Sequence, residues 1–238
     1  MKTYRLWEKY FKVAQPTYME VWYPKLAQYT IPSVQILLGP EHINCLLGQP
    51  VNDMVRQDLS KMIGQAFVIL GGNRFFIRLG SVSPKDVSTM VTDIDTVFEI
   101  FAKSERAGKS LKMSQQFQYT PSLYIRQWVD IDKTREFRCF VKNNELKGIS
   151  QYYCYDTCEY LNDDNIRDLL ISRVKALFEH IHSRVGLNSY VFDIVYRDEE
   201  LPLLLEINPY SGWTGTCLFD WTEDNFEGNL ELRYYGRE

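Results

Sequence analysis

Long apolar runs are missing from this sequence of 238 residues. No stretch approaches the ~20 consecutive apolar residues that a transmembrane helix requires. The first residues lead into an amphipathic segment that includes Glu8 and Lys9, and they lack the apolar core of a signal peptide. We therefore expect no membrane association and a cytoplasmic location.

Histidine and cysteine are also scarce, and neither forms a recognisable site. The sequence has 3 histidines and 5 cysteines. His180 and His182 are two residues apart on a predicted helix and so face different directions, which disfavours a histidine metal site or a catalytic triad. An odd, scattered set of cysteines is typical of reduced thiols in the cytosol.

Excess charge of one sign is absent as well. The net charge is −4 and the pI is near 5.5, which argues against a dedicated nucleic-acid-binding protein. Internal repeats and low-complexity segments are not found. Apolar content of 45% and charged content of 24% are ordinary for a globular protein, and the length suits one large domain or two small lobes.

Residues 191–198 and 203–210 form the most informative pattern. Both segments are apolar or alternating, and a charged break lies between them, which predicts a β-hairpin. Side chains alternate between the faces of a strand, so Glu206 and Asn208 share a face. If the loop keeps odd-numbered residues opposite even-numbered ones, Asp193 joins them on one side of the hairpin.

This grouping predicts a metal site. Two carboxylates close together in apolar strands repel each other, and each is costly to bury alone. A divalent cation removes both costs, and the oxygens of Asp193, Glu206 and Asn208 are hard ligands that suit magnesium bound together with phosphates. The plainer interpretation remains open: the acids are solvated, and Glu206 and Asn208 only form a rim before Pro209.

A second pattern, in residues 75–101, predicts a strand, a loop of small residues and a helix. The helix is expected to begin at Ser83-Pro84, with Ser83 as N-cap, and to carry an apolar face through Phe101. Free N–H groups at such a helix start can bind phosphate, although Lys85 does not have the spacing of a P-loop. A well-capped helix without a ligand is the alternative.

Other elements follow from periodicity and capping. We expect helices at about 4–14, at 52–64 with Asn52 as cap and Gly64 as stop, and at 163–185 closed by Gly186. A strand is expected at 33–38, and residues 108–119 are predicted to be a mobile connector.

Three more strands are expected at 123–131, 136–141 and 146–153, and their alternation gathers polar side chains. One face of the first strand carries Tyr124, Arg126, Trp128 and Asp130, and one face of the second carries Glu136 and Arg138. Arginines beside a flat aromatic ring would suit a nucleotide. A solvent-facing polar surface is the plainer alternative.

On these motifs the chain resembles the family of cell division cycle protein 123, a branch of the ATP-grasp superfamily. The resemblance extends from about Trp22 to Trp221. It rests on Gly71-Gly72, Phe76–Leu79, Ser83–Asp86, Arg126-Gln127-Trp128, the long string Glu136–Leu146 with Gly148–Gln151, Phe192-Asp193, Glu206–Tyr210 and Leu218–Trp221.

The resemblance implies an α+β, ATP-grasp-like fold whose two lobes, residues 1–110 and 111–238, enclose a nucleotide cleft between antiparallel sheets. Magnesium would be bound by Asp193, Glu206 and Asn208. Arg126 and Arg138 would contact phosphate and act in catalysis. The remaining contacts to ATP would come from Arg78, Lys85, Tyr124, Trp128, Glu136 and Asp193.

Some positions depart from the family's pattern. Arg78 stands where the family has a lysine, and it keeps the charge in a larger, forked group. Gly80-Ser81 replaces a polar–aromatic pair. Glu206 stands where the family favours Asp, and Glu is common in ATP-grasp ligases. The family's acidic insertion and extended C-terminal tail do not occur in this sequence.

Three functions are therefore weighed. The first is an ATP-dependent carboxylate–amine ligase that acts on a peptide or protein through an acyl-phosphate, where positioning and charge neutralisation supply catalysis. The alternative is a non-catalytic ATP-binding assembly factor that binds translation initiation factor two through its gamma subunit, as in the resembled family. The third is an α+β binding module without a nucleotide.

Overall fold

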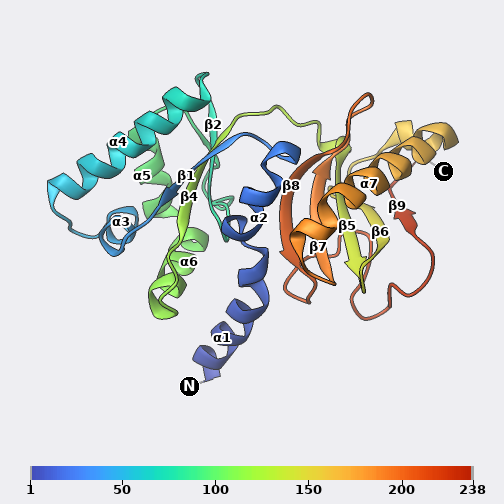
Figure 1. Cartoon of the computed structure of the whole chain (residues 1–238), viewed down its shortest axis with the longest axis horizontal. Coiled ribbons are helices and arrows are strands. Elements are labelled where there is room, and N and C mark those ends of the chain that lie inside the picture. Colours follow the sequence, from blue (N-terminus) through green and yellow to red (C-terminus); the bar gives the residue numbers. More distant parts are fainter. Residues whose placement is uncertain (1, 237–238) are drawn as a thin grey trace. The chain divides into compact units, whose positions relative to one another are not determined.

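Two sheets organise residues 2–236, the part of the chain that the computed structural model describes (Figure 1). Each sheet belongs to its own unit. The first unit comprises residues 1–15 and 31–129, and the second comprises 16–30 and 130–238. The predicted α+β class with two sheets is confirmed. The predicted lobes divide the chain at residue 110, whereas the first unit extends to residue 129.

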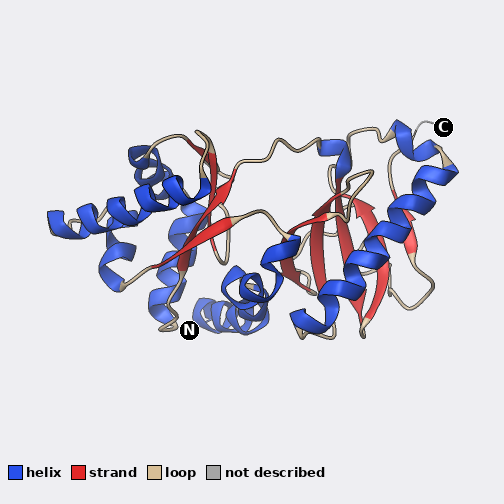
Figure 2. Ribbon diagram, turned by 45° about the horizontal axis from the view of Figure 1, so that its top comes forward, coloured by secondary structure: helices blue, strands red, loops and turns tan. Residues whose placement is uncertain are grey.

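The described part of the first unit contains a four-stranded antiparallel sheet in the order β1-β4-β2-β3 and five helices. Figure 2 shows the strands in red and the helices in blue. The apolar face of β2 and β4 forms a buried core with residues of α4 and α5. The strands are β1 (Ser33–Leu37), β2 (Phe75–Leu79), β3 (Met90–Val91) and β4 (Ser122–Gln127). The helices are α1 (Lys2–Ala14), α3 (Pro40–Leu46), α4 (Asp53–Leu70), α5 (Ile94–Lys103) and α6 (Glu105–Gln116).

The second unit contains a five-stranded sheet in the order β8-β7-β5-β6-β9. All neighbouring strands are antiparallel except β6 and β9, which are parallel. The strands are β5 (Glu136–Lys142), β6 (Glu145–Gln151), β7 (Tyr190–Val195), β8 (Leu203–Pro209) and β9 (Glu231–Arg233). The helices are α2 (Met19–Leu26) and α7 (Asp164–Val185), with short 3-10 turns at Ala27–Tyr29, Lys133–Arg135 and Glu159–Asn162. A further 3-10 turn, Gln15–Thr17, begins at the last residue of the first unit's N-terminal part.

Helix α7 lies across one face of the second sheet (Figure 1). It begins where Asp163 accepts a hydrogen bond from the backbone of Asn165 and ends at Gly186, whose φ of 73° is the left-handed conformation that favours glycine. The ring of His182 stacks on Tyr190 of β7, so the face that carries Tyr190 is turned toward α7. By alternation, Asp193 lies on the opposite face, which we call the site face.

Three sequence-based expectations about helices are wrong. The helix that was expected to stop at Gly64 continues to Leu70 and ends at Gly71, which has a φ of 66°. Gly64 stays helical because it packs against α5: a Cβ placed there would lie 3.5 Å from Ile94 Cδ1. The predicted connector at 108–119 is mostly helix α6, whose N-cap Ser104 accepts from the backbone of Ala107.

The helix predicted to begin at Ser83 is the third error. Residues 85–87 form a turn, β3 follows, and the helix begins at Ile94 with Asp93 as its N-cap. Asp86 lies in that turn and contacts the start of α6 instead, where it accepts hydrogen bonds from Ser104 Oγ and from the backbone of Arg106. Asp86, an acid of the expected capping pattern, therefore makes tertiary contacts with α6 and does not stabilise a helix that begins at Ser83.

None of the helices within residues 2–236 is long and apolar enough to cross a membrane.

Candidate functional site

The hairpin of β7 and β8 places the three predicted metal ligands on the site face. Antiparallel pairing sets Asp193 directly opposite Glu206, and Val191 directly opposite Asn208. Opposite residues share a face, and residues two apart on one strand do too. The predicted convergence of Asp193, Glu206 and Asn208 is therefore present, and their binding of a metal stays a prediction.

Arg138 of β5 is the basic partner of Asp193. The two residues lie opposite each other, and Arg138 donates from Nε to Oδ1 and from Nη2 to Oδ2, both at 2.8 Å. Asn208 donates from Nδ2 to the same Oδ2 at 3.2 Å. Asp193 is only 2% exposed and Arg138 only 7%. The result is a buried, two-point ion pair, a geometry that makes a strong charge-assisted hydrogen bond.

The ion pair keeps Arg138 charged. Burial acts to lower the pKa of Arg138, but the charge of Asp193 and the hydrogen bonds to it outweigh burial and raise the pKa. A buried pair of this kind is costly to break, because either partner alone would be an uncompensated charge in a dry environment.

Two groups that the sequence did not reveal complete the surroundings of Arg138. The ring of Tyr152, one residue after β6, lies 4.8 Å from the guanidinium carbon, and the carbonyl of Gly215 accepts from Nη1 at 2.6 Å. Burial, followed by the charge of Asp193, raises the pKa of the Tyr152 phenol, which stays protonated at neutral pH. Gly215 contributes only a backbone atom, so no side-chain pattern could have identified it.

A cysteine thiol and a further acid lie near Arg138. Burial raises the pKa of Cys217 to about 12, and this thiol is hydrogen-bonded with that of Cys154, so it is neutral at physiological pH. Glu136 precedes Arg138 by two residues, shares its face and is 9% exposed. Glu136 was predicted to contact the nucleotide, and its placement on the site face keeps that prediction open to test.

The side chains on the site face fit a magnesium ion by the chemistry of their donors. Magnesium is usually held by one or two carboxylates together with substrate phosphates and several waters. Asp193 and Glu206 provide two carboxylates. Asn208 uses its nitrogen for Asp193, so its carbonyl oxygen is the atom suited to a cation. Within residues 2–236 no cluster of three or more His, Cys, Asp or Glu side chains could hold a metal, so the fit rests on two acids and an amide.

The first unit carries the other predicted arginines. Pairing places Arg78 of β2 opposite Tyr124 of β4, and Arg126 of β4 opposite both Phe76 and Ser33, so these side chains share one face of the first sheet. Arg78 is 4% exposed and donates to the carbonyl of Leu79, and Arg126 is 3% exposed and donates to Ser33 Oγ at 3.2 Å. Both arginines are thus held in place on the face of Tyr124.

Lys85 and Trp128 lie outside the strands of that face. Lys85 is exposed in the turn after Ser83, where no helix begins, so the phosphate-binding helix start expected there is wrong. Trp128 directly follows β4, and the guanidinium of Arg74 lies 5.7 Å from its ring centre. Contacts of Lys85 and Trp128 with a nucleotide stay predictions.

A family model described as D123 matches residues 57–231, which is well over half of the chain and includes the whole hairpin. The chain belongs to the D123 family. The predicted family membership is thereby confirmed, because the D123 family is that of Cdc123.

Relatives and a solved structure agree with this assignment. A translation initiation factor eIF2 assembly protein of Dictyostelium discoideum is 31% identical over 73% of this chain, and the match covers 48% of that protein. The chain thus spans about half the length of this relative. A putative CDC123-like protein of Acanthamoeba polyphaga mimivirus is 24% identical over 82% of the chain and 64% of its own length.

The structure of Cdc123 from Schizosaccharomyces pombe has a TM-score of 0.79 at 20% sequence identity, and the match covers 94% of this D123-family chain and 96% of that one. At this level of identity the match shows that the two proteins share a fold.

Proposed function

We propose that this D123-family chain is a magnesium-ATP-binding assembly factor that acts on a subunit of translation initiation factor two. The observation that carries the nucleotide part is the buried Arg138–Asp193 pair with Glu206 and Asn208 on the same face. The partner rests on the Dictyostelium discoideum relative, which is named an eIF2 assembly protein. A role in initiation-factor assembly would mean that the protein acts in the cytoplasm.

Asp193, Glu206 and Asn208 would hold the magnesium ion, which when bound would neutralise phosphate charge. Arg138 would bind a phosphate oxygen. A guanidinium has five N–H groups, and Arg138 uses three of them for Asp193 and Gly215. The remaining N–H groups, held in position by the other bonds, are the donors suited to phosphate.

The relatives favour assembly over the ligase activity that ranks first from the sequence. Their names describe assembly proteins and give no ligase activity. The same residues would serve either role, because ATP-grasp ligation needs positioning and charge neutralisation rather than a nucleophile. ATP turnover is therefore the property that separates the two functions.

Isothermal titration of magnesium-ATP into wild-type protein and Glu206→Gln tests the nucleotide part. Glu206→Gln keeps the shape of the side chain and removes one ligand charge, so affinity should fall on the order of 10-fold or more. Glu200→Gln is the control, since Glu200 is an exposed acid that pairs with Arg197 in the β7–β8 loop. A wild-type protein that does not bind magnesium-ATP would contradict the proposal.

The second arm adds the purified gamma subunit of initiation factor two and measures both binding and ADP formation. We expect binding that depends on magnesium-ATP and no more ADP than Glu206→Gln produces. Excess ADP that disappears in Glu206→Gln would instead establish turnover and favour the ligase. Magnesium-ATP binding without any affinity for the subunit would refute the assembly role.

A further inference from the structure

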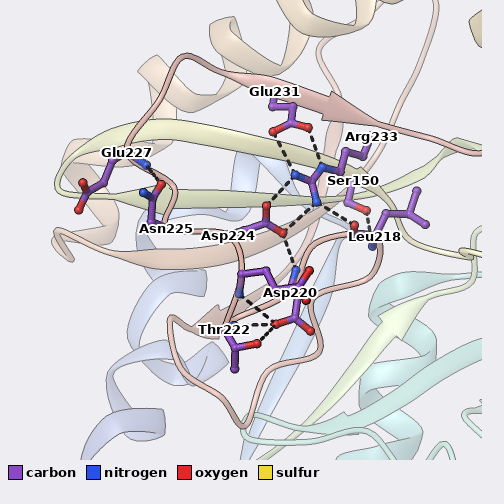
Figure 3. Close-up of polar contacts among 10 residues, drawn as sticks. Ser150, Leu218, Asp220, Thr222, Asp224, Asn225, Glu227, Glu231 and Arg233 are labelled. Carbon is purple, nitrogen blue, oxygen red and sulfur yellow. Dashed lines mark hydrogen bonds and ion pairs between the residues drawn. The ribbon is translucent and has the colours of Figure 1, made fainter.

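Residues 210–233, which we call the C-terminal segment, contact the site face through the carbonyl of Gly215 and the rings of Phe219 and Phe226. Arg233 of β9 connects several parts of this segment (Figure 3). Arg233 donates from both terminal nitrogens to the carboxylate of Asp224 at 2.6 and 2.8 Å. It also donates to the backbone carbonyl of Leu218 at 3.1 Å and to Glu231 at 2.7 Å. One guanidinium therefore joins three separate parts of the segment.

Leu218 connects this arginine to the site. Its backbone N–H donates to Ser150 Oγ at 3.0 Å (Figure 3). Ser150 is fully buried on β6, directly opposite Arg138. Three residues before Leu218, the carbonyl of Gly215 accepts from Arg138. The backbone held by Arg233 is thus the backbone that orients Arg138.

The same loop is tied to the strand of the predicted metal ligands. Thr214 Oγ1 donates to the carbonyl of Pro209 at 2.6 Å, and Pro209 directly follows Asn208. Trp221 Nε1 donates to the carbonyl of Thr214 at 2.7 Å. Asp224 accepts from the backbone of Asp220 at 2.7 Å, which continues the connection back to Arg233.

We propose that Arg233 is a positioning residue for the nucleotide site: it holds residues 214–224 so that the Gly215 carbonyl keeps Arg138 on Asp193. This inference rests on the proposed function. The hydrogen bonds of Arg233 go to Leu218, Asp224 and Glu231, and its guanidinium lies over the ring of Phe219. Its effect on Arg138 therefore passes through the backbone from Leu218 to Gly215. Partners of this outer kind typically change metal affinity 10- to 100-fold when they are lost.

Arg233→Gln is the test variant and Glu231→Gln is its matched control. Both remove an ion pair of the same guanidinium, but only Arg233→Gln releases Asp224 and Leu218. In titrations of magnesium-ATP, we expect Arg233→Gln to weaken affinity on the order of 10-fold. Glu231→Gln should stay within about twofold, because an exposed ion pair contributes little. Equal affinities for the two variants would overturn the proposal.

A double-mutant cycle separates positioning from general stabilisation. In an Arg138→Lys background the Gly215 carbonyl no longer has a guanidinium to orient, so Arg233→Gln should have little further effect on affinity. If Arg233 only stabilised the fold, it would weaken binding equally in both backgrounds, and that result would refute the proposal. Arg233→Lys should restore affinity in part, since it keeps the charge without the fork.

Hydrogen exchange supplies a readout without ligand. Arg233→Gln should accelerate exchange of the amides of Thr214, Leu218 and Phe219, which are hydrogen-bonded within this loop or to Ser150. Unchanged exchange would overturn the inference. Failure of wild-type protein to bind magnesium-ATP would refute the proposed function by itself, and the exchange rates would still show whether Arg233 holds the loop.

Discussion

At the scale of single residues, Arg138 contacts three different groups at once, which requires the planar, forked guanidinium of an arginine. It contacts both oxygens of Asp193, the carbonyl of Gly215 and the ring of Tyr152. A lysine has three donors on one atom and could not reproduce this geometry. Because the Arg138–Asp193 pair is buried, its loss should lower the stability of the folded protein as well as weaken ligand binding.

Arg138→Gln should therefore be strongly destabilising. The substitution leaves Asp193 as a buried charge without its guanidinium, which typically costs about 3–5 kcal/mol. Lys103→Gln is the control, because Lys103 pairs with Glu99 at the surface, where both side chains are 66% exposed and such a pair is worth about 0–1 kcal/mol. Urea unfolding measures both free energies. Similar losses for the two variants would show that the buried pair is not what holds Asp193.

At the scale of elements, the site face has an apolar half beside its polar half. Phe140 lies two residues after Arg138 on β5 and packs with Phe219 and Phe226 of the C-terminal segment. Gly148 of β6 makes this possible, because a Cβ there would lie 3.0 Å from the Phe219 ring and 3.1 Å from the Phe226 ring. The glycine is needed for close approach of the rings rather than for a turn.

Gly148→Ala should then destabilise the fold by about 1–3 kcal/mol, since the added methyl overpacks two aromatic rings. Gly212→Ala is the control: a Cβ at Gly212 has no heavy atom within 4 Å, so the change should be near neutral. Thermal and urea unfolding of the two variants measure the difference. An equal, small effect would mean that the rings move aside freely.

At the scale of the whole molecule, several surface carboxylates favour their charged forms in the folded state. Hydrogen bonds lower the pKa of five aspartates, and in all of them except Asp86 the largest cause is a hydrogen bond from another side chain. The pairs are Asp93 with Thr96, Asp132 with Thr134, Asp220 with Thr222, and Asp224 with Arg233. Asp93, Asp132 and Asp220 are exposed, so each makes a small contribution, whereas the side chain of Asp224 is only 19% exposed.

These shifts predict loss of stability in acid. The folded pKa of each group lies below its unfolded value, close to 3.8, so the ionised form is the stabilising one. The contribution is fully present above the unfolded pKa and is lost as pH falls through the folded pKa. Urea midpoints should thus change little from this source between about pH 7 and pH 5 and should fall below about pH 4. Asp224→Asn should reduce that fall, and an unchanged slope would contradict the assignment.

Local patterns in the sequence were sufficient to predict one hairpin, one long helix and the grouping of the predicted metal ligands. The hairpin of β7 and β8, the helix closed by Gly186 and the convergence of Asp193 with Glu206 and Asn208 follow from alternation, capping and a short loop. These features depend on interactions between residues that are near one another in the chain, so the sequence alone indicates them. The family resemblance, confirmed by the D123 model, rests on the same segments.

Only the tertiary structure decided where two of the helices begin or end and which basic residue pairs with Asp193. Ser83-Pro84 has the chemistry of a helix start, yet Asp93 caps the helix, because the preceding residues form β3 against β2. Gly64 looks like a helix stop, yet packing against Ile94 carries the helix past it. The pairing of Arg138 with Asp193 needs β5 to lie beside β7, across 55 residues of chain. Such contacts depend on strand order and burial, which no local pattern encodes.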